Sequence, residues 1–380
     1  MDKKSVKKII TRLFFKLCYW QLKIEMILFG YTQKSRILCE EVELPIDGEI
    51  IQLEADIVPV YGNRKGIVTI VSDDGFYVSG VHLNELVKKY NLRATIAGAV
   101  SFVKPYLQEW KKILSEGYLE MVSHSYRHKA LREGDEISLE KDRIYFEIVR
   151  SARWLEKNFY NNEKQVSFVC PEGAICENAN KILQENGFYS VRRAGQGYNT
   201  LDPREGKERG EWFSLNVKGI CEKDVDEDER RQWIDEVANS HLWLIEMWHN
   251  VMESDDGFYQ TILKEEAEEH LRYISDVKKE GRIWVATLTE ATKYIRERQN
   301  AKVMSWCMQN NVYLKVTIDT NILPEMIFNY PLTVKVKVPE TMVGRVYYYR
   351  KNKLEVLKDC ILLADIVPNG LVHKIEFENE

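Results

Sequence analysis

Side chains that can bind a metal ion or transfer a proton follow several short apolar runs of this sequence. They are Asp73 and Asp74 after residues 67–71, His124 and His128 after 119–122, Glu172 after 166–169, and His249 after 243–248. The whole sequence of 380 residues has only seven histidines, so three of them at the ends of two such runs form an unusual concentration. These positions are therefore the candidates for chemistry.

The two histidines at positions 124 and 128 are four residues apart, which puts both imidazoles on one side of a helical turn. With one carboxylate of the Asp-Asp pair they would form a three-ligand site that leaves coordination positions open for water and substrate, as in catalytic zinc sites. The predicted cofactor is therefore a divalent metal ion, and Zn²⁺ is the expected one. The same ligand types also occur in non-haem iron oxygenases.

The Asp-Asp pair has a second interpretation, because acids after a strand can also cap a helix N-terminus. The sequence contains its own comparison, since Ser254–Tyr259 repeats the six letters SDDGFY of Ser72–Tyr77. The second copy follows no buried run and leads into a polar helical stretch, so we interpret it as a helix cap. Only the first copy has the strand context of a site.

Short apolar runs alternate with amphipathic helical stretches from Gly66 to about residue 298. This alternation predicts a parallel sheet with helices on its faces, and seven or eight runs predict a (β/α) barrel that is distorted or incomplete. In such a barrel, reactive groups lie just past the carboxyl ends of the strands. The candidate side chains all follow predicted strands, so we expect them to meet at one end of the barrel.

The sequence predicts three domains. Residues 65–300 form the barrel, and residues 301–380, where apolar and polar residues alternate without helices, form a small antiparallel β domain of sandwich type. Residues 1–64 form an N-terminal extension with an amphipathic helix and a β-hairpin around the turn at 45–48.

The first thirty residues contain lysines followed by an apolar stretch, but Arg12 and Lys16 interrupt it, so neither a signal peptide nor a membrane span fits. On a helix, Lys8, Arg12, Lys16 and Lys23 fall near one face. One interpretation is a peripheral membrane contact through residues 1–30. The preferred interpretation is a helix packed on its own protein.

Composition narrows the class of protein. Hydrophobic residues make up 44% and charged residues 30% of the chain, as in ordinary globular proteins. The net charge of -5 argues against a nucleic-acid partner, which would require a basic face. The seven cysteines include no CxxC pair, so we expect reduced thiols in a cytoplasmic protein.

The motifs resemble those of the polysaccharide deacetylases, the NodB-homology group of family 4 carbohydrate esterases, over most of the predicted barrel. The resemblance implies that Asp73 is the general base, that Asp74, His124 and His128 bind the metal, and that His249 is the acid. It also implies hydrolysis of N-acetyl or O-acetyl groups on a carbohydrate by a metal-activated water.

The sequence departs from that family directly after the run at 166–169. The arginine that normally orients the base is absent, because Cys170 stands in its place. We expect the oxyanion to be bound by a backbone N–H of Glu172 or Gly173, and Trp248 to stack on a sugar ring, although core packing is the alternative for Trp248. The missing arginine leaves an inactive sugar-binding homologue as an alternative function.

Overall fold

The computed structural model describes residues 50–161, 163–204, 211–222, 225–255, 257–325 and 327–378. The predicted N-terminal helix, its membrane contact and the hairpin turn at 45–48 lie outside the described residues. The described chain forms two compact units. One contains residues 67–292, and the other contains the described residues of 50–66 and 293–378.

Seven parallel strands close into a barrel in the first unit. They are, in order around the barrel, β3 (Gly66–Ser72), β4 (Ala94–Gly98), β5 (Leu119–Ser123), β6 (Ser167–Val169), β7 (Ser190–Gln196), β9 (Leu215–Gly219) and β10 (Leu242–Trp248). The barrel closes because β10 pairs in parallel with β3, with Trp243 opposite Ile67 and Trp248 opposite Ser72. The predicted fold class, a (β/α) barrel with a small antiparallel β domain, is confirmed.

Four shorter strands complete the sheets of this unit. They are β8 (Asn199–Thr200), antiparallel to β10, β13 (Ile283–Val285), beside β3, and the separate parallel pair β11 (Asn250–Met252) and β12 (Thr261–Leu263). The pair β11–β12 continues the chain directly after β10, at the end of the barrel where the candidate residues lie.

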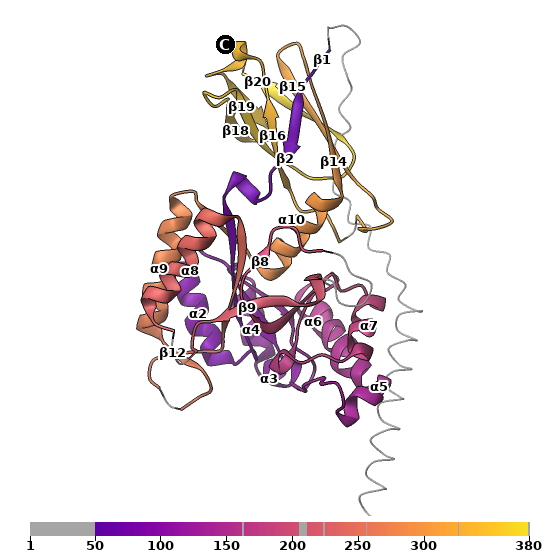
Figure 1. Ribbon diagram of the computed structural model, residues 1–380, viewed down its shortest axis with the longest axis vertical. Coiled ribbons are helices and arrows are strands. Elements are labelled where there is room, and N and C mark those ends of the chain that lie inside the picture. The colour runs from indigo at the N-terminus through magenta and orange to yellow at the C-terminus, as the bar shows by residue number, and fades with distance from the viewer. Residues whose placement is uncertain are drawn as a thin grey trace, which may run out of the picture. The chain divides into compact units, whose positions relative to one another are not determined.

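Helices cover the outside of the barrel. They are α2 (Tyr77–Lys89), α3 (Val100–Val103), α4 (Leu107–Leu114), α5 (Lys141–Tyr145), α6 (Ser151–Phe159), α7 (Glu177–Glu185), α8 (Glu227–Ser240), α9 (Lys264–Lys279) and α10 (Leu288–Asn300). Figure 1 shows α2, α8 and α9 side by side on one flank, and α9 packs against both of the others. No helix in the described part of the chain is long and apolar enough to cross a membrane.

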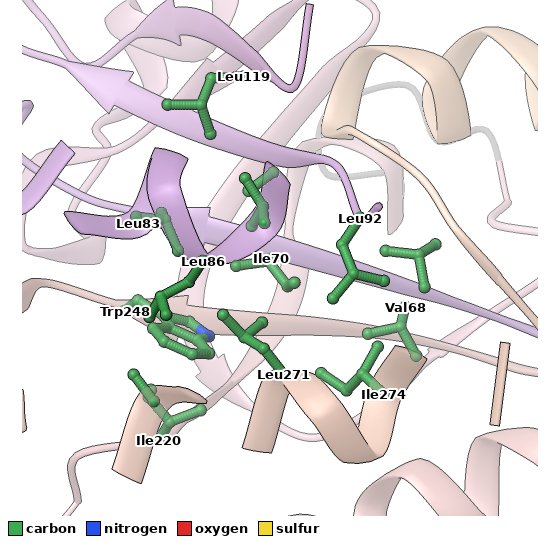
Figure 2. Packing of buried hydrophobic residues seen from close by; sticks show 14 of the residues in the cluster. Val68, Ile70, Leu83, Leu86, Leu92, Leu119, Ile220, Trp248, Leu271 and Ile274 are labelled. Carbon is green, nitrogen blue, oxygen red and sulfur yellow. The ribbon is translucent and has the colours of Figure 1, made fainter. Parts of the chain in front are cut away.

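The largest hydrophobic cluster lies between the barrel and these helices. Val68 and Ile70 of β3 face α2 and α9, where Leu86 and Leu271 are buried (Figure 2). All seven residues of β3 are buried, since one face of the strand meets the helices and the other meets the barrel interior. Full burial of each such aliphatic side chain contributes about 1.5–3 kcal/mol, so this cluster fixes where β3 ends.

The second unit consists of two antiparallel sheets. Its strands are β1 (Ile51–Gln52), β2 (Glu54–Ile57), β14 (Ala301–Met308), β15 (Asn311–Ile318), β16 (Leu332–Lys337), β17 (Val346–Tyr349), β18 (Asn352–Glu355), β19 (Ile361–Ile366) and β20 (Val372–Phe377). The six-stranded sheet has the order β1-β14-β15-β20-β17-β18, and the three-stranded sheet has the order β19-β16-β2. The strands β1 and β2, in the segment expected to belong to the N-terminal extension, pair with β14 and β16 rather than with each other.

Candidate metal and catalytic site

The Asp-Asp pair lies in the tight turn between β3 and α2. Asp74 has a φ of 73° and Gly75 has a φ of 81°, so the chain reverses immediately after the strand. A side chain at Gly75 would meet Val103 at 2.9 Å and the backbone of Gly98 at 3.0 Å. Glycine is therefore required here, because it tolerates both the left-handed conformation and the close approach of β4.

Asp74, His124 and His128 come together as the sequence predicted. One ligand atom from each side chain lies within 4.8 Å of the other two. Oδ1 of Asp74 is 3.0 Å from Nε2 of His128 and 3.8 Å from Nε2 of His124. One carboxylate and two imidazole nitrogens that converge in this way fit a divalent ion, and they leave further coordination positions for water and substrate.

The hydrogen bond on the far side of His124 supports this assignment. Nδ1 of His124 lies 2.9 Å from the carbonyl oxygen of Val169, which can only accept, so Nδ1 carries the proton and the lone pair of Nε2 faces Asp74. A backbone carbonyl that fixes the tautomer in this way is the usual partner of a metal-binding histidine. The chemistry of these residues thus fits a metal site.

Electrostatics at the cluster follow from burial and proximity. Burial lowers the pKa of His124 to about 4, which favours the neutral imidazole that a metal requires. Burial acts to raise the pKa of Asp74, but the hydrogen bond to His128 and the nearby His124 and His249 outweigh it, and its pKa is lowered. The same hydrogen bond raises the pKa of His128.

The loop between the two histidines is held by Glu147, a residue that the sequence did not single out. Its fully buried carboxylate accepts hydrogen bonds from the backbone N–H groups of Tyr126 and Arg127 at 3.1 and 2.9 Å, and from Nε of Arg127 at 2.7 Å. Glu147 lies in a π-helical turn, Phe146–Arg150, between α5 and α6. Such turns occur often beside functional sites, and this one directs a carboxylate at the loop that carries His128.

Asp73 has a different partner from its neighbour. Nη2 of Arg192, on β7, donates to both carboxylate oxygens of Asp73, and the two side chains are 1% and 5% exposed. Arg192 thus reaches Asp73 from β7, the barrel strand that follows β6 and Cys170 in the chain. The sequence signal was a charged residue within a buried run, since Val191 and Arg192 are both buried in β7.

His249 follows β10, where successive side chains alternate between the two faces of the barrel. Leu244 and Trp248 lie in the cluster under the helices, whereas Sδ of Met247 is 3.6 Å from Nη1 of Arg192 inside the barrel. If the alternation of side chains along β10 continues for one more residue, His249 faces the same side as Met247. Hydroxyls of Ser72 and Ser79 both donate to the carbonyl oxygen of His249 at 3.0 Å, which fixes this residue beside the end of β3.

The ring of His249 lies against Tyr259. Its buried Nδ1 has no hydrogen-bond partner among the residues that the structure describes. Its ring meets that of Tyr259 edge to face, with centroids 5.0 Å apart and an interplanar angle of 90°. The imidazole lies close enough to Asp74 to lower the pKa of that carboxyl.

The segment after β6 contains the two residues predicted to supply an oxyanion donor. The backbone N–H of Gly173 donates to the carbonyl of Cys170 at 3.0 Å, so it already has an acceptor. Glu172 has a φ of 54°, and its side chain pairs with Arg132 at the surface. Gly173 cannot be enlarged, because a Cβ there would lie 2.4 Å from Ala194.

Trp248, predicted to stack on a sugar, is fully buried in the hydrophobic cluster (Figure 2). Its Nε1 donates to Glu246 at 3.0 Å, and Glu246 in turn lies 2.8 Å from Nε2 of His270. Since no part of the indole is exposed, Trp248 cannot contact a substrate in this structure and serves as a core residue.

The second SDDGFY copy forms a loop rather than a helix cap. It lies between β11 and β12, and α9 begins only at Lys264, after Leu263, which makes no side-chain cap. Asp255 instead accepts a hydrogen bond from the N–H of Gly257 at 3.1 Å. The cap interpretation is therefore wrong, and this copy brings Tyr259 against His249.

Residues 61–191 match the family model described as polysaccharide deacetylase. The resemblance seen in the sequence motifs is therefore confirmed over this stretch, which is similar to the polysaccharide deacetylase family. The matched stretch includes Asp73, Asp74, His124 and His128 but ends before Arg192 and His249. No curated protein matches the sequence significantly.

Three solved structures are among those to which this chain is similar. A protein from Mycobacterium smegmatis assigned to the polysaccharide deacetylases is 14% identical, with 64% of this chain and 94% of that chain covered and a TM-score of 0.50. A family 4 carbohydrate esterase from Streptomyces lividans in complex with acetate is 13% identical over 59% and 94%, with a TM-score of 0.41. A family 4 pseudoenzyme from Bacillus anthracis is 19% identical over 61% and 66%, with a TM-score of 0.41.

Proposed function

We propose that this protein is a metal-dependent deacetylase that hydrolyses acetyl groups, on nitrogen or oxygen, from a carbohydrate. The proposal rests mainly on one observation: the adjacent acids Asp73 and Asp74 have different partners. Asp74 faces two imidazoles, and Asp73 faces a buried arginine. The imidazoles beside Asp74 suit a metal ligand, and the arginine beside Asp73 suits a general base that must be held in one orientation.

Asp74, His124 and His128 would hold the metal, with Zn²⁺ as the expected ion. A bound divalent ion would polarise the acetyl carbonyl and lower the pKa of a coordinated water. His124 and Asp74 are 1% and 9% exposed, so the ligands themselves are shielded from bulk water while the more exposed His128 lies on the open side.

Asp73 would accept the proton of the attacking water as general base. Arg192 holds both carboxylate oxygens and so fixes the orientation of the base. Nη1 of Arg192 also contacts the carbonyl of Arg193 at 3.3 Å, which keeps the guanidinium in place. The base is therefore preorganised without the arginine that the family carries one strand earlier.

His249 would protonate the leaving amine, because an amine anion is a very poor leaving group. The developing oxyanion needs a hydrogen-bond donor besides the metal. Since the N–H of Gly173 is already hydrogen-bonded to Cys170, the backbone N–H of Glu172 is the candidate donor.

The two alternative functions receive less support. The inactive sugar-binding homologue was motivated by the absent arginine, and the contact of Arg192 with both oxygens of Asp73 weakens that motive. An iron oxygenase needs neither a second buried acid with an arginine nor the proton donor at His249.

An acetate-release assay with metal-loaded protein tests the proposal on N-acetylated and O-acetylated sugars and their oligomers. We expect release that stops on chelation and returns with Zn²⁺. Metal-loaded protein that binds sugar without releasing acetate would be the inactive homologue. Oxygen consumption with Fe²⁺ and no hydrolysis would establish the oxygenase.

A further inference from the structure

We propose that Glu147 is a positioning residue for the metal site, and that it sets the affinity for the metal through His128. The inference rests on the metal dependence of the proposed function. Glu147 lies outside both the sequence motifs and the three-ligand cluster, in the π-helical turn Phe146–Arg150. Its removal should nevertheless weaken metal binding.

The two histidines of the cluster are held in different ways. The N–H of His124 donates to the carbonyl of Gly98 at 3.1 Å, and its Nδ1 lies 2.9 Å from the carbonyl oxygen of Val169. The side chain of His124 is 1% exposed, whereas that of His128 is 27% exposed. His128 stands at the far end of loop 125–128, so its position depends on the conformation of that loop.

Loop 125–128 has a conformation that its sequence does not favour. Ser125 has a φ of 67° and His128 has a φ of 54°, so both ends of the loop lie in the left-handed region. This region is unfavourable for residues other than glycine, and it persists only where surrounding contacts hold the chain. Contacts from outside the loop must therefore select the conformation that turns His128 toward Asp74.

Those contacts reach the loop from two sides. Two N–H groups of α3, from Val100 and Ser101, donate to the carbonyls of Ser125 and the next residue at 3.2 and 2.8 Å. From the other side, Oε2 of Glu147 accepts the N–H groups of residues 126 and 127 at 3.1 and 2.9 Å. Without this carboxylate, both N–H groups in the middle of the loop would lose their acceptor, which is costly away from water.

The carboxylate of Glu147 is itself held firmly. Its other oxygen, Oε1, lies 2.7 Å from Nε and 2.6 Å from Nη2 of Arg127. The ring of Phe146, in the same π-helical turn, packs on the ring of Tyr126 with centroids 4.7 Å apart, and the guanidinium of Arg127 lies 5.2 Å from the Phe146 centroid. Hydrogen bonds shielded from water in this way are stronger than exposed ones, so Glu147 can offset the unfavourable loop conformation.

The neighbouring helix α6 offers a matched control. Glu156 is 2% exposed, accepts the N–H of Gln165 at 2.9 Å and pairs with Arg153 at 2.7 Å. It therefore combines a buried carboxylate, a backbone donor and an arginine as Glu147 does, but these partners lie outside loop 125–128. Loss of either acid should lower stability, and only loss of Glu147 should weaken metal binding.

The test measures the Kd for Zn²⁺ by competition with a chelator. We expect Glu147→Leu to raise this Kd roughly 10–100-fold, the usual effect of removing a partner that orients a metal ligand. Glu147→Gln keeps one oxygen for the two N–H groups but sets an amide N–H₂ against Arg127, so its Kd should rise less. Glu156→Leu and Glu156→Gln should bind Zn²⁺ as the wild type does.

An unchanged Kd in Glu147→Leu, or an equal rise in Glu156→Leu, would overturn the inference. If Glu147→Leu does not fold, the two glutamine variants decide, and equal Kd values in Glu147→Gln and Glu156→Gln would overturn it.

A double-variant cycle tests whether Glu147 acts through His128. Adding Glu147→Gln to His128→Ala should cause no further rise in Kd, because the ligand that Glu147 positions is already gone. A further rise equal to that of Glu147→Gln alone would show that Glu147 acts elsewhere and would overturn the inference. A wild type that binds Zn²⁺ but releases no acetate would overturn the proposed deacetylase function and leave this inference standing. A wild type that binds no Zn²⁺ would overturn both.

Discussion

The two SDDGFY segments have the same six residues but form different structures. In the first copy Asp73 and Asp74 are 5% and 9% exposed, in a turn after a strand that is paired on both sides. In the second copy every described residue, including Asp255, is exposed, and the preceding strand β11 pairs only with β12. Chemical function at these positions therefore depends on the surrounding strands and not on the hexapeptide.

The difference has an energetic basis. An exposed carboxylate keeps its hydration and needs no partner, whereas a buried one must be compensated by hydrogen bonds or opposite charge. The first copy meets this requirement with Arg192 for one acid and two imidazoles for the other. In the second copy Asp255 is exposed and accepts a local hydrogen bond from the N–H of Gly257.

The largest contrast should come from the metal ligand. Asp74→Ala removes the only carboxylate of the three-ligand cluster, so we expect it to lose nearly all bound metal and all activity. The matched change in the second copy, Asp255→Ala, should leave metal content and turnover as in the wild type. Metal content is measured by elemental analysis of dialysed protein. Full occupancy in Asp74→Ala would remove this residue from the ligand set.

The second contrast separates the two acids of the first copy. Asp73→Asn keeps the size of the side chain but removes the proton acceptor, so it should retain metal while kcat falls about 10²–10⁴-fold. Asp255→Asn is the control and should keep the metal content and kcat of the wild type. Steady-state acetate release and metal analysis on the same preparations provide the test. If Asp73→Asn instead loses its metal, the roles of Asp73 and Asp74 must be exchanged.

The third prediction concerns Arg192, the partner of Asp73 in the first copy. Arg192→Met leaves the Asp73 carboxylate buried without its cation, and breaking a buried pair from one side costs about 3–5 kcal/mol of unfolding free energy. The double variant Asp73→Asn/Arg192→Met should be more stable than Arg192→Met alone, because no charge is left behind. Urea unfolding of the four proteins measures the coupling.

If the losses of unfolding free energy in the two single variants add up to the loss in the double variant, Arg192 and Asp73 do not stabilise each other. The same Arg192→Met enzyme should also show reduced kcat with metal retained, since the base loses its fixed orientation. A metal-depleted Arg192→Met protein would indicate that Arg192 supports the ligands instead.

The sequence predicted the parts of the site that local pattern determines. Apolar runs followed by acids or histidines were enough to predict the barrel and the convergence of Asp74, His124 and His128. Arg192 was missed because a strand pattern does not reveal which buried side chain reaches across the barrel. It comes from β7, which is neighbour to β6 and β9 but not to β3.

Two other predictions, for Trp248 and for the second SDDGFY copy, were wrong because they did not consider which side of a strand a residue faces or which elements surround it. Trp248 and His249 are adjacent in sequence, yet successive residues of a strand face opposite sides, so the tryptophan lies under the helices and the histidine faces the site. The second SDDGFY copy was assigned to a helix start because a polar helix follows it. The helix begins later, after β12, and short strands such as β11 and β12 give only a weak sequence pattern.

The last prediction tests the rule that a buried acid needs a cation. Glu297 of α10 is fully buried, and its Oε1 accepts a hydrogen bond from the N–H of Tyr330 at 2.9 Å. Its Oε2 has no hydrogen-bond partner among the described residues, in contrast to the two oxygens of Asp73. Burial raises the pKa of Glu297 from 4.5 to about 8. The folded state therefore favours the protonated acid.

The sign of the pH dependence follows from this pKa. The unfolded chain releases the proton near pH 4.5 and the folded chain only near pH 8, so stability is full below the lower value and is lost as pH rises through the upper one. Within that window the unfolding free energy should fall by up to about 1.4 kcal/mol per pH unit from this group. Glu297→Gln mimics the neutral acid and should remove that slope. The unfolding free energy of the variant should therefore increase relative to that of the wild type as pH rises. Urea unfolding of both proteins at intervals across the window measures the difference. A difference that does not change with pH would mean that Glu297 is compensated in the fold, as Asp73 is by Arg192.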